Sequence, residues 1–516
     1  KVIEGQGQLE LELGRILPDL GANVRCGNSL IDVDFPLPLD PTDEERLRYI
    51  PFNWGQEFPQ VFRNGAGGFD AVIGNPPYLS IDAVWGKKDA RLAYIKSHYA
   101  EIQTDKTDIL FYFFAKAVEI CRGEIGFIVS RSFLEADKAQ KLRGWLSTHS
   151  RVREVVDFRE ATVFPRVGIN TAIVRLTGSK AVRSAVFRQY RRKSLPPGYL
   201  AGHLSDPKAF VVNHKPLGEL GTAAWISTDD FTAALLAKID SSGVPVGQIL
   251  HVGQGMQTGS NTAFVVPPAQ AELLEAARRG GVLAKRARNS DIHAFDIHDD
   301  GPSILYLEDA RFFTALPPLV RRHLSQSRGE LESRAAFQRG DCEWWKYTWP
   351  LHKEYLRRPR ILVPYRAKVN RFAVDPAAEY LGLTDTTVLY DDGQPEDLDY
   401  IAAVLNSKVM TYRFRYIGKL VGGGTYEYFH NTVGKLVVPR RTANVEAHDA
   451  ISKLGRLAAE QASIARSTLV RAEQKHALDS FHELQEQIEG RVAALYGLTM
   501  GEREAINVAL SEVAAE

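Results

Sequence analysis

Hydrophobic and polar positions follow two alternating periods along the first 180 residues. Apolar residues at helical spacing predict helices over 8–20, 107–124 and 139–149. Short, nearly continuous apolar runs predict strands over 22–32, 69–75, 123–134, 152–158 and 170–178. Strands that alternate with helices in this way predict an α/β unit with a largely parallel sheet. Such sheets bind ligands beyond the carboxyl ends of their strands, where Asn28 and Asn75 both fall.

The pattern changes after residue 178. Residues 179–244 contain the basic, proline-broken stretch FRQYRRKSLPPG, which we interpret as a connector. Residues 245–440 mix short apolar runs with Gly, Pro and Asp turns and predict a separate α+β domain. Residues 441–516 are rich in Ala, Glu and Gln at helical spacing and predict a helical tail.

Composition excludes little for this chain of 516 residues. Its 64 Lys and Arg nearly balance its 63 Asp and Glu, so a nucleic-acid partner must be argued from local clusters. Three widely spaced cysteines show no metal-ligand spacing and fit a reducing cytoplasm, so we expect a cytoplasmic protein without a metal. No apolar run has transmembrane length, and we expect no membrane association.

The stretch FDAVIGNPPYLS ends an apolar run with Asn75, Pro76, Pro77 and Tyr78. Asn-Pro is a common turn starter, so a simple turn is one interpretation. Two prolines in this context also make a rigid corner that has carbonyl oxygens but no N–H groups. With the Asn side-chain oxygen and an aromatic ring beside it, the corner suits a flat group that carries hydrogen-bond donors, such as the exocyclic amine of a nucleobase.

The sequence GNPPY resembles the catalytic motif of DNA amino-methyltransferases that use S-adenosylmethionine, and Asn-Pro-Pro-Tyr is typical of those acting on adenine N6. The resemblance to large restriction–modification or phage-defence enzymes continues through 23–32, 106–130 and 161–176. Segments 253–264, 361–374, 401–416 and 436–441 resemble their target-recognition domain. It implies a Rossmann-like methyltransferase sheet in 1–178, a connector in 179–244, a target-recognition domain in 245–440 and a helical tail.

The resemblance also implies roles for single residues. Asn75 and the carbonyl of Pro76 would accept hydrogen bonds from the target amine, and Pro77 would stiffen the corner. Tyr78 would stack on a base flipped out of the duplex, and Phe164 would cover its other face. Asn28 and Phe113 would contact the adenine of S-adenosylmethionine. Ordinary alternatives stay open, because Asn28 also suits a turn and both phenylalanines also suit a core.

One part of the family pattern is missing. The glycine-rich loop that cradles the methionine part of the cofactor, and the acidic residue that holds its ribose, do not occur in the 516 residues. We therefore expect the sheet to be incomplete at its N-terminus. An upstream part of the same protein or a partner chain would complete the cofactor site.

Basic residues interleaved with aromatics are the candidate contacts to double-stranded DNA. The clusters comprise Arg357, Arg358, Arg360, Arg366, Lys368, Arg371, Arg413, Arg415 and Lys419. The alternative for each cluster is a solvated surface.

The sequence thus predicts the catalytic-motif and recognition portion of a site-specific adenine-N6 DNA methyltransferase. The alternatives are a DNA-binding specificity module without its own activity and a methyltransferase acting on another amine, such as glutamine.

Overall fold

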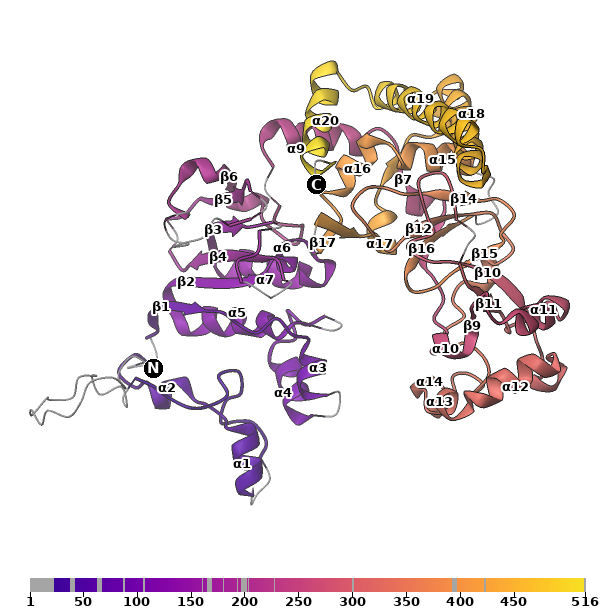
Figure 1. Cartoon of the computed structure of the whole chain (residues 1–516). Helices are drawn as coiled ribbons and strands as arrows, with labels where there is room; N and C mark the ends of the chain where they lie inside the picture. The colour runs from indigo at the N-terminus through magenta and orange to yellow at the C-terminus, as the bar shows by residue number, and fades with distance from the viewer. Residues whose placement is uncertain are drawn as a thin grey trace, which may run out of the picture. The chain divides into compact units, whose positions relative to one another are not determined.

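A computed structural model gives the fold of the chain (Figure 1). It describes residues 23–37, 42–62, 67–86, 89–104, 107–159, 161–164, 169–179, 181–192, 194–195, 202, 204–226, 228–298, 301–391, 397–421 and 424–514. The helix expected over 8–20 lies outside these residues. The chain divides into a first unit, Lys1–Arg159 with Thr171–Trp225, and a second unit, Glu160–Asn170 with Ile226–Glu516.

The first unit contains a mixed six-stranded sheet in the order β1-β2-β4-β3-β5-β6. Its strands are β1 (Phe69–Gly74), β2 (Cys121–Ser130), β3 (Arg151–Asp157), β4 (Thr171–Thr177), β5 (Ser184–Tyr190) and β6 (Phe210–Pro216). β1 pairs parallel with β2, and β3 with β5, whereas the other pairings are antiparallel. The α/β class is therefore confirmed, although the sheet is less parallel than the sequence pattern predicted.

Helices of the first unit are short apart from those that pack on the sheet. They are α1 (Asp43–Tyr49), α2 (Trp54–Glu57), α3 (Ile81–Trp85), α4 (Ala90–His98), α5 (Ile109–Ile120), α6 (Ser132–Glu135) and α7 (Gln140–His149). α5 packs on β2, α7 packs on β3, and the two helices contact each other, so they cover the same face. Phe114 joins α5 to the sheet, with ring centroids 5.1 Å from Phe127 and 5.2 Å from Phe133.

In the first unit, three features differ from those predicted from the sequence. The strand expected over 22–32 is replaced by turns and one isolated bridge between Asn28 and Pro51, because this stretch has no neighbouring strand to pair with among the described residues. α5 ends at Ile120 because Cys121 already has extended backbone and begins β2. β5 and β6, which lie inside the expected connector 179–244, continue the sheet.

The described residues of the second unit form four small sheets, in the orders β15-β10-β11-β9, β14-β12-β16-β8, β13-β18-β17 and β19-β7. The strands are β7 (Val244–Pro245), β8 (His251–Gln254), β9 (Val265–Val266), β10 (Leu283–Ala287), β11 (Ser303–Leu305), β12 (Arg360–Pro364), β13 (Arg366–Ala367), β14 (Ala373–Asp375), β15 (Tyr380–Gly382), β16 (Thr386–Tyr390), β17 (Lys419–Val421), β18 (Thr425–Glu427) and β19 (Val437–Val438). These separate small sheets, together with the helices around them, are the expected α+β class.

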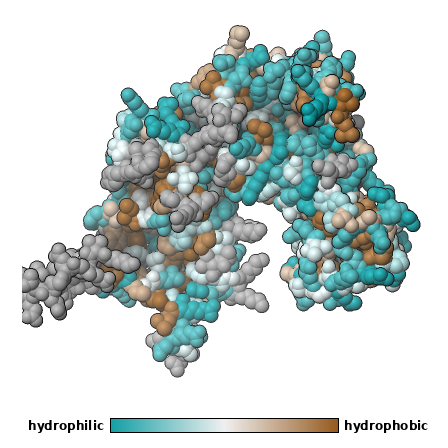
Figure 2. Space-filling view, viewed as in Figure 1, coloured by the Kyte–Doolittle hydropathy of each residue, from teal (hydrophilic) through white to brown (hydrophobic). Residues whose placement is uncertain are grey.

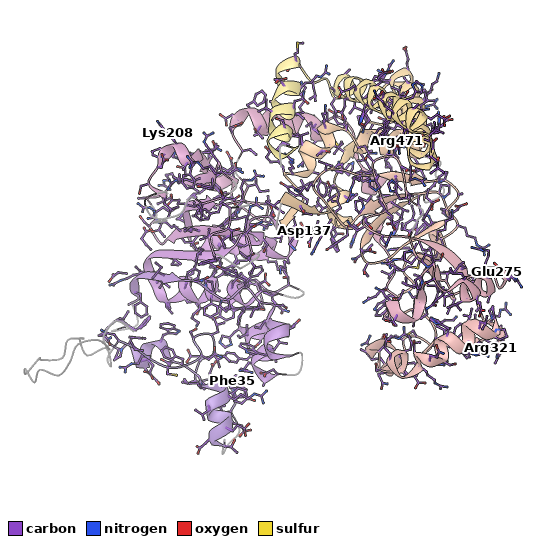
Figure 3. The ribbon with its side chains drawn as sticks, viewed as in Figure 1. Phe35, Asp137, Lys208, Glu275, Arg321 and Arg471 are labelled. Atoms are coloured by element: carbon purple, nitrogen blue, oxygen red, sulfur yellow. The ribbon has the colours of Figure 1, made fainter. Side chains whose placement is uncertain are left out.

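Short helices surround these sheets, and long helices follow at the end of the chain. The short ones are α9 (Asp230–Asp240), α10 (Asn261–Phe264), α11 (Ala271–Arg279), α12 (Pro318–Gln326), α13 (Arg328–Glu332), α14 (Ala335–Gln338), α15 (Leu398–Leu405), α16 (Lys408–Phe414) and α17 (His430–Val433). The helical tail predicted from the sequence consists of α18 (Val445–Ser467), α19 (Arg471–Leu495) and α20 (Met500–Ala514). α11 and α12 contact each other and carry Glu275 and Arg321 (Figure 3).

The tail is part of the second unit's core. α18 packs on α15, and α19 and α20 pack on α16. Ile451, Ile488, Val492, Tyr496 and Ile506 are all buried in one cluster with residues of α15 and α16. Because this burial removes apolar side chains from water, the tail stabilises the unit that it covers.

Candidate active site and nucleic-acid interface

The Asn-Pro-Pro-Tyr corner directly follows the carboxyl end of β1, as the sequence pattern predicted. Gly74 is the last residue of β1 that pairs with β2, opposite Phe127. A Cβ on Gly74 would lie 3.1 Å from the Phe127 ring, so glycine allows the strand and the ring to approach closely. Asn75 and Pro77 are exposed, and Pro76 is buried. The two prolines end strand pairing here because neither has an N–H group.

Tyr78 lies with its ring packed against the first unit's core and its hydroxyl at the corner. The hydroxyl oxygen lies 2.6 Å from Oδ1 of Asn75 and 3.1 Å from the carbonyl oxygen of Ile128. A phenol has one proton, so it donates to one of these acceptors at a time. Burial raises the pKa of Tyr78, and the hydroxyl therefore stays a donor at neutral pH. This contact orients the side-chain oxygen of Asn75.

A pocket of about 270 Å³ opens beside the corner. Its lining residues come from four segments: Ser29 and Trp54; Val72, Ile73, Gly74, Asn75, Pro76 and Pro77; Phe113, Lys116, Ala117 and Ile120; and Phe127. The surface over β1 and α5 carries hydrophobic residues (Figure 2), among them Ile73, which is 91% exposed. A mostly apolar pocket with aromatic walls suits a flat ring such as the adenine of a nucleotide-like cofactor.

Hydrogen bonds fix one wall of this pocket. The indole Nε1 of Trp54 donates to the carbonyl of Ser29 at 3.2 Å. The backbone N of Asn28 donates to the carbonyl of Ile50 at 2.7 Å. Phe35, labelled in Figure 3, is buried after the same segment with its ring edge-on to Tyr94, 5.4 Å between centroids. The segment before the corner is therefore anchored although it forms no strand.

The structure brings Phe113 together with Asn75, Pro76 and Pro77 in one pocket. Asn28 is half-buried and adjoins the lining residue Ser29. Its Oδ1 accepts a hydrogen bond from Leu30 N at 3.2 Å, which is a contact expected of a turn residue. Phe164 is half-buried in the segment Glu160–Asn170, which groups with the second unit, and its pairing with Tyr78 stays a prediction.

Several lining residues were missed in the sequence, among them Lys116 and Trp54. Lys116 lies one helical turn after Phe113, so helical spacing places both on one face of α5. The Nζ of Lys116 lies 2.6 Å from Oε2 of Glu119. Trp54 occurs in an aromatic-rich stretch, but no local pattern shows that this stretch meets β1. Its position depends on long-range packing.

The candidate DNA contacts in the second unit differ sharply in exposure. The side chain of Arg357 is 92% exposed, that of Arg366 58% and that of Lys419 47%, and Lys368 is also exposed. These four side chains reach solvent. Among the remaining candidates, Arg358, Arg371 and Arg415 are half-buried.

Two of the predicted DNA contacts have their partners within the protein. Arg360 is 1% exposed, because β12 is a central strand, and its Nε donates to the carbonyl of Arg358 at 3.2 Å. Arg413 has a side chain 13% exposed, and both ends of its guanidinium bind the carboxylate of Asp240 at 2.6 and 2.8 Å. Both arginines hold the protein's own segments together.

In the part of the chain that the structure describes, no three His, Cys, Asp or Glu side chains gather in a way that could hold a metal ion. Within the same residues, every helix is too short or too polar to cross a bilayer.

Comparison with known proteins gives this geometry a context. Residues 28–164 match the family described as Eco57I restriction-modification methylase. Type II methyltransferase M.BstVI of Geobacillus stearothermophilus is 20% identical over 394 residues, which are 72% of this chain and 67% of that protein. The restriction enzyme and methyltransferase RM.Eco57I of Escherichia coli is 25% identical over 258 residues, 48% of this chain but 23% of that protein.

The fold also has a counterpart among solved structures. The Type IIL restriction-modification enzyme MmeI, solved in complex with DNA, superposes with a TM-score of 0.60 at 11% identity. The match covers 92% of this chain and 61% of that protein, so the chain spans less than two thirds of it. The match over residues 28–164 and the Type II methyltransferase relatives confirm the resemblance to restriction–modification methyltransferases.

Proposed function

We propose that this chain carries the catalytic corner and the target-recognition region of a site-specific DNA adenine-N6 methyltransferase that uses S-adenosylmethionine in a restriction–modification or phage-defence system. The observation that carries the proposal is the corner of Asn75, Pro76, Pro77 and Tyr78 at the end of β1, with Phe113 in the adjoining pocket. The matched domain and the Type II methyltransferase relatives support it.

The corner explains how a poor nucleophile is activated. The lone pair of an adenine amine is delocalised into the ring. Oδ1 of Asn75 and the carbonyl of Pro76 accept the two N–H groups of the amine, which favours tetrahedral geometry and frees the lone pair. Because Pro77 stiffens the corner and Tyr78 already orients Oδ1, the acceptors need little reorganisation in the transition state.

The pocket residues fit the adenine part of the cofactor. Phe113, Trp54 and Phe127 provide aromatic walls and Ser29 provides polar atoms, and Asn28 precedes Ser29 in the sequence. S-adenosylmethionine supplies an electrophilic methyl group when it is bound. Among the described strands, β1 pairs with β2 alone. We propose that an upstream part of the protein or a partner chain lies along the other edge of β1 and completes the cofactor site.

The target base requires a second set of contacts. An adenine inside a duplex reaches the corner only when it is flipped out, which costs a few kcal/mol. Tyr78 beneath the base and Phe164 above it would return about 1–3 kcal/mol each by stacking. The exposed basic side chains Arg357 and Lys368 would supply sequence-independent affinity through phosphate contacts.

Methyl transfer to duplex DNA tests this proposal. With the enzyme in its complete form, radiolabelled S-adenosylmethionine and an adenine-containing duplex, we expect Asn75→Ala to lower turnover by at least about 100-fold with DNA affinity retained, since it removes one preorganised acceptor. Asn75→Asp keeps an acceptor at the same position and is the matched control, with turnover above that of Asn75→Ala.

Three results distinguish the alternatives. Turnover of Asn75→Ala near that of the unaltered enzyme would contradict the catalytic assignment. DNA binding without methylation by the unaltered enzyme would identify a specificity module. Methyl transfer to peptide glutamine in place of the duplex would identify a protein methyltransferase.

A further inference from the structure

A row of three charged side chains crosses the small sheet β13-β18-β17. Strand register places Arg366 opposite Glu427, and Glu427 opposite Lys419. The adjacent row consists of Ala367, Tyr426 and Leu420, all of which are buried. Because successive residues of a strand point to opposite faces, the charged row lies on the outer face of the sheet.

Glu427 links the two cations of this row. Its Oε1 lies 2.9 Å from Nη2 of Arg366, and its Oε2 lies 2.8 Å from Nζ of Lys419. Burial acts to raise the pKa of Glu427, but the hydrogen bonds from Lys419 and Arg366 outweigh it and lower the pKa. The carboxylate is therefore ionised at neutral pH, with a side chain 9% exposed, whereas its partners are about half exposed.

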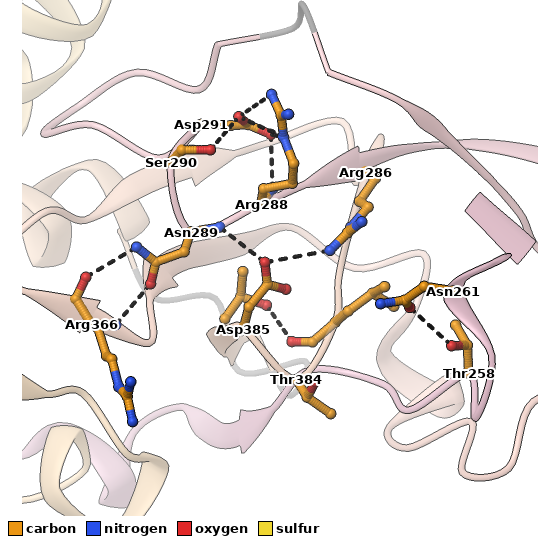
Figure 4. A network of polar contacts seen from close by, with 12 residues as sticks. Thr258, Asn261, Arg286, Arg288, Asn289, Ser290, Asp291, Arg366, Thr384 and Asp385 are labelled. Carbon is orange, nitrogen blue, oxygen red and sulfur yellow. Dashed lines mark hydrogen bonds and ion pairs between the residues drawn. The ribbon is translucent and has the colours of Figure 1, made fainter. Parts of the chain in front are cut away.

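The backbone of Arg366 is fixed as well. Its N–H donates to Oδ1 of Asn289 at 2.8 Å, and its carbonyl accepts from Nδ2 of Asn289 at 3.0 Å (Figure 4). The backbone N of Asn289 in turn donates to Oδ2 of Asp385 at 3.3 Å. With its main chain and its guanidinium both held, Arg366 loses less conformational freedom when it binds a ligand than a free surface arginine does.

The charge of the row selects the kind of ligand. An ionised carboxylate beside both cations repels a phosphate, so the row is a poorer phosphate site than Arg357, which is 92% exposed and pairs only loosely with the exposed Asp309 at 3.9 Å. A neutral edge with hydrogen-bond acceptors has no such penalty. In the major groove, guanine presents the acceptors O6 and N7, which a guanidinium binds with two parallel hydrogen bonds.

We propose that Arg366 reads a guanine of the recognised DNA sequence through its major-groove edge, with Lys419 as a further donor and with Glu427 and Asn289 as positioning residues. This inference rests on the proposed function, since it assumes that the second unit binds duplex DNA. It assigns one base contact among side chains that otherwise contribute general affinity.

Selection from a randomised duplex library, followed by affinity measurements on the chosen sequence, tests the assignment. We expect Arg366→Ala to bind the chosen duplex about 5- to 150-fold more weakly and to lose its preference at one guanine. Replacing that guanine by 7-deazaguanine should weaken the unaltered protein but not Arg366→Ala. Glu427→Gln should lower discrimination at the same position while its affinity for random duplex stays equal or rises.

Arg357→Ala is the matched control, because it removes an exposed arginine whose carboxylate partner, Asp309, lies 3.9 Å away and is itself 76% exposed, whereas Glu427 is 2.9 Å from Arg366 and 9% exposed. It should weaken all duplexes equally and reduce the slope of log affinity against log salt by about 0.9. The same uniform loss for Arg366→Ala would overturn the assignment and make Arg366 a phosphate contact. Unchanged binding by Arg366→Ala would also overturn it. An unaltered protein that binds no duplex would refute the proposed function instead.

Discussion

Glu489 of α19 offers a test of how the helical tail is attached to the second unit. Both of its carboxylate oxygens accept a hydrogen bond from the backbone N of Lys408 at the start of α16, at 2.9 and 3.0 Å. Burial is the main cause that raises the pKa of Glu489, from an ordinary value of 4.5 to about 7. Below about pH 7 the folded protein therefore holds this carboxyl in its protonated form.

The sign of the pH effect follows from this shift. The stability that the site contributes is fully present below pH 4.5 and is lost as pH rises through about 7, because the folded protein must then bury a charge. Each tenfold change in acidity is worth about 1.4 kcal/mol, so the loss is at most about 3.5 kcal/mol. Glu489→Gln keeps the shape and an acceptor but cannot ionise. We expect it to equal the unaltered protein near pH 5 and to be more stable at pH 8.

Denaturant unfolding between pH 5 and pH 8.5, followed by a probe in the second unit, measures the difference. Glu486→Gln is the matched control, since Glu486 lies one turn away on α19, has a side chain 74% exposed and pairs with Nζ of Lys408 at 3.2 Å. It should change the unfolding free energy by less than about 1 kcal/mol at any pH. A Glu489→Gln protein less stable than the unaltered one at pH 8 would refute the reasoning, because it would show that the carboxylate stabilises the start of α16 through the helix dipole.

Four further substitutions separate structural from functional side chains. Tyr78→Phe keeps the ring but removes the hydrogen bond to Asn75, so turnover in the methylation assay should fall by no more than about tenfold; a complete loss would contradict the view that the hydroxyl only orients Asn75. Arg360→Ala should lower the unfolding free energy by about 3 kcal/mol and leave the salt dependence of DNA binding unchanged. Arg357→Ala should leave the unfolding free energy unchanged and reduce the salt dependence of DNA binding. Arg143→Met should destabilise the first unit by at least about 2 kcal/mol in thermal unfolding, because the buried guanidinium donates to the carbonyls of four residues, Phe133, Ala136, Thr222 and Ala223; an unchanged melting temperature would contradict this.

Much of the first unit could be predicted because its signals are local. The predicted helix over 139–149 corresponds to α7, and the apolar runs around residues 125, 155 and 174 correspond to β2, β3 and β4. The corner at Asn75 was predictable because two prolines after an apolar run leave few conformations to the chain. The stretch 22–32 was predicted to be a strand but forms turns. An apolar run forms a strand only when a neighbouring strand is available to pair with it.

The candidate site was only half predictable for a similar reason. Phe113 could be named from its place in the motif order, and the structure places it in the pocket with the corner. Trp54 lines the same pocket and donates a hydrogen bond to Ser29, which lies 25 positions earlier in the sequence. No periodicity encodes such a contact.

Arg360 and Arg366 show why a basic cluster cannot be converted directly into a binding surface. They lie six positions apart in one stretch, yet one is buried and the other half exposed. Arg360 begins β12, which has β14 on one side and β16 on the other and in which every residue is buried. Arg366 begins β13, an edge strand of a different sheet, so its side chain reaches solvent. The apolar run Ile361–Val363 after Arg360 is the local sign of a buried strand, and an arginine at the start of such a run is better interpreted as a structural residue whose guanidinium binds carbonyls at the strand's end.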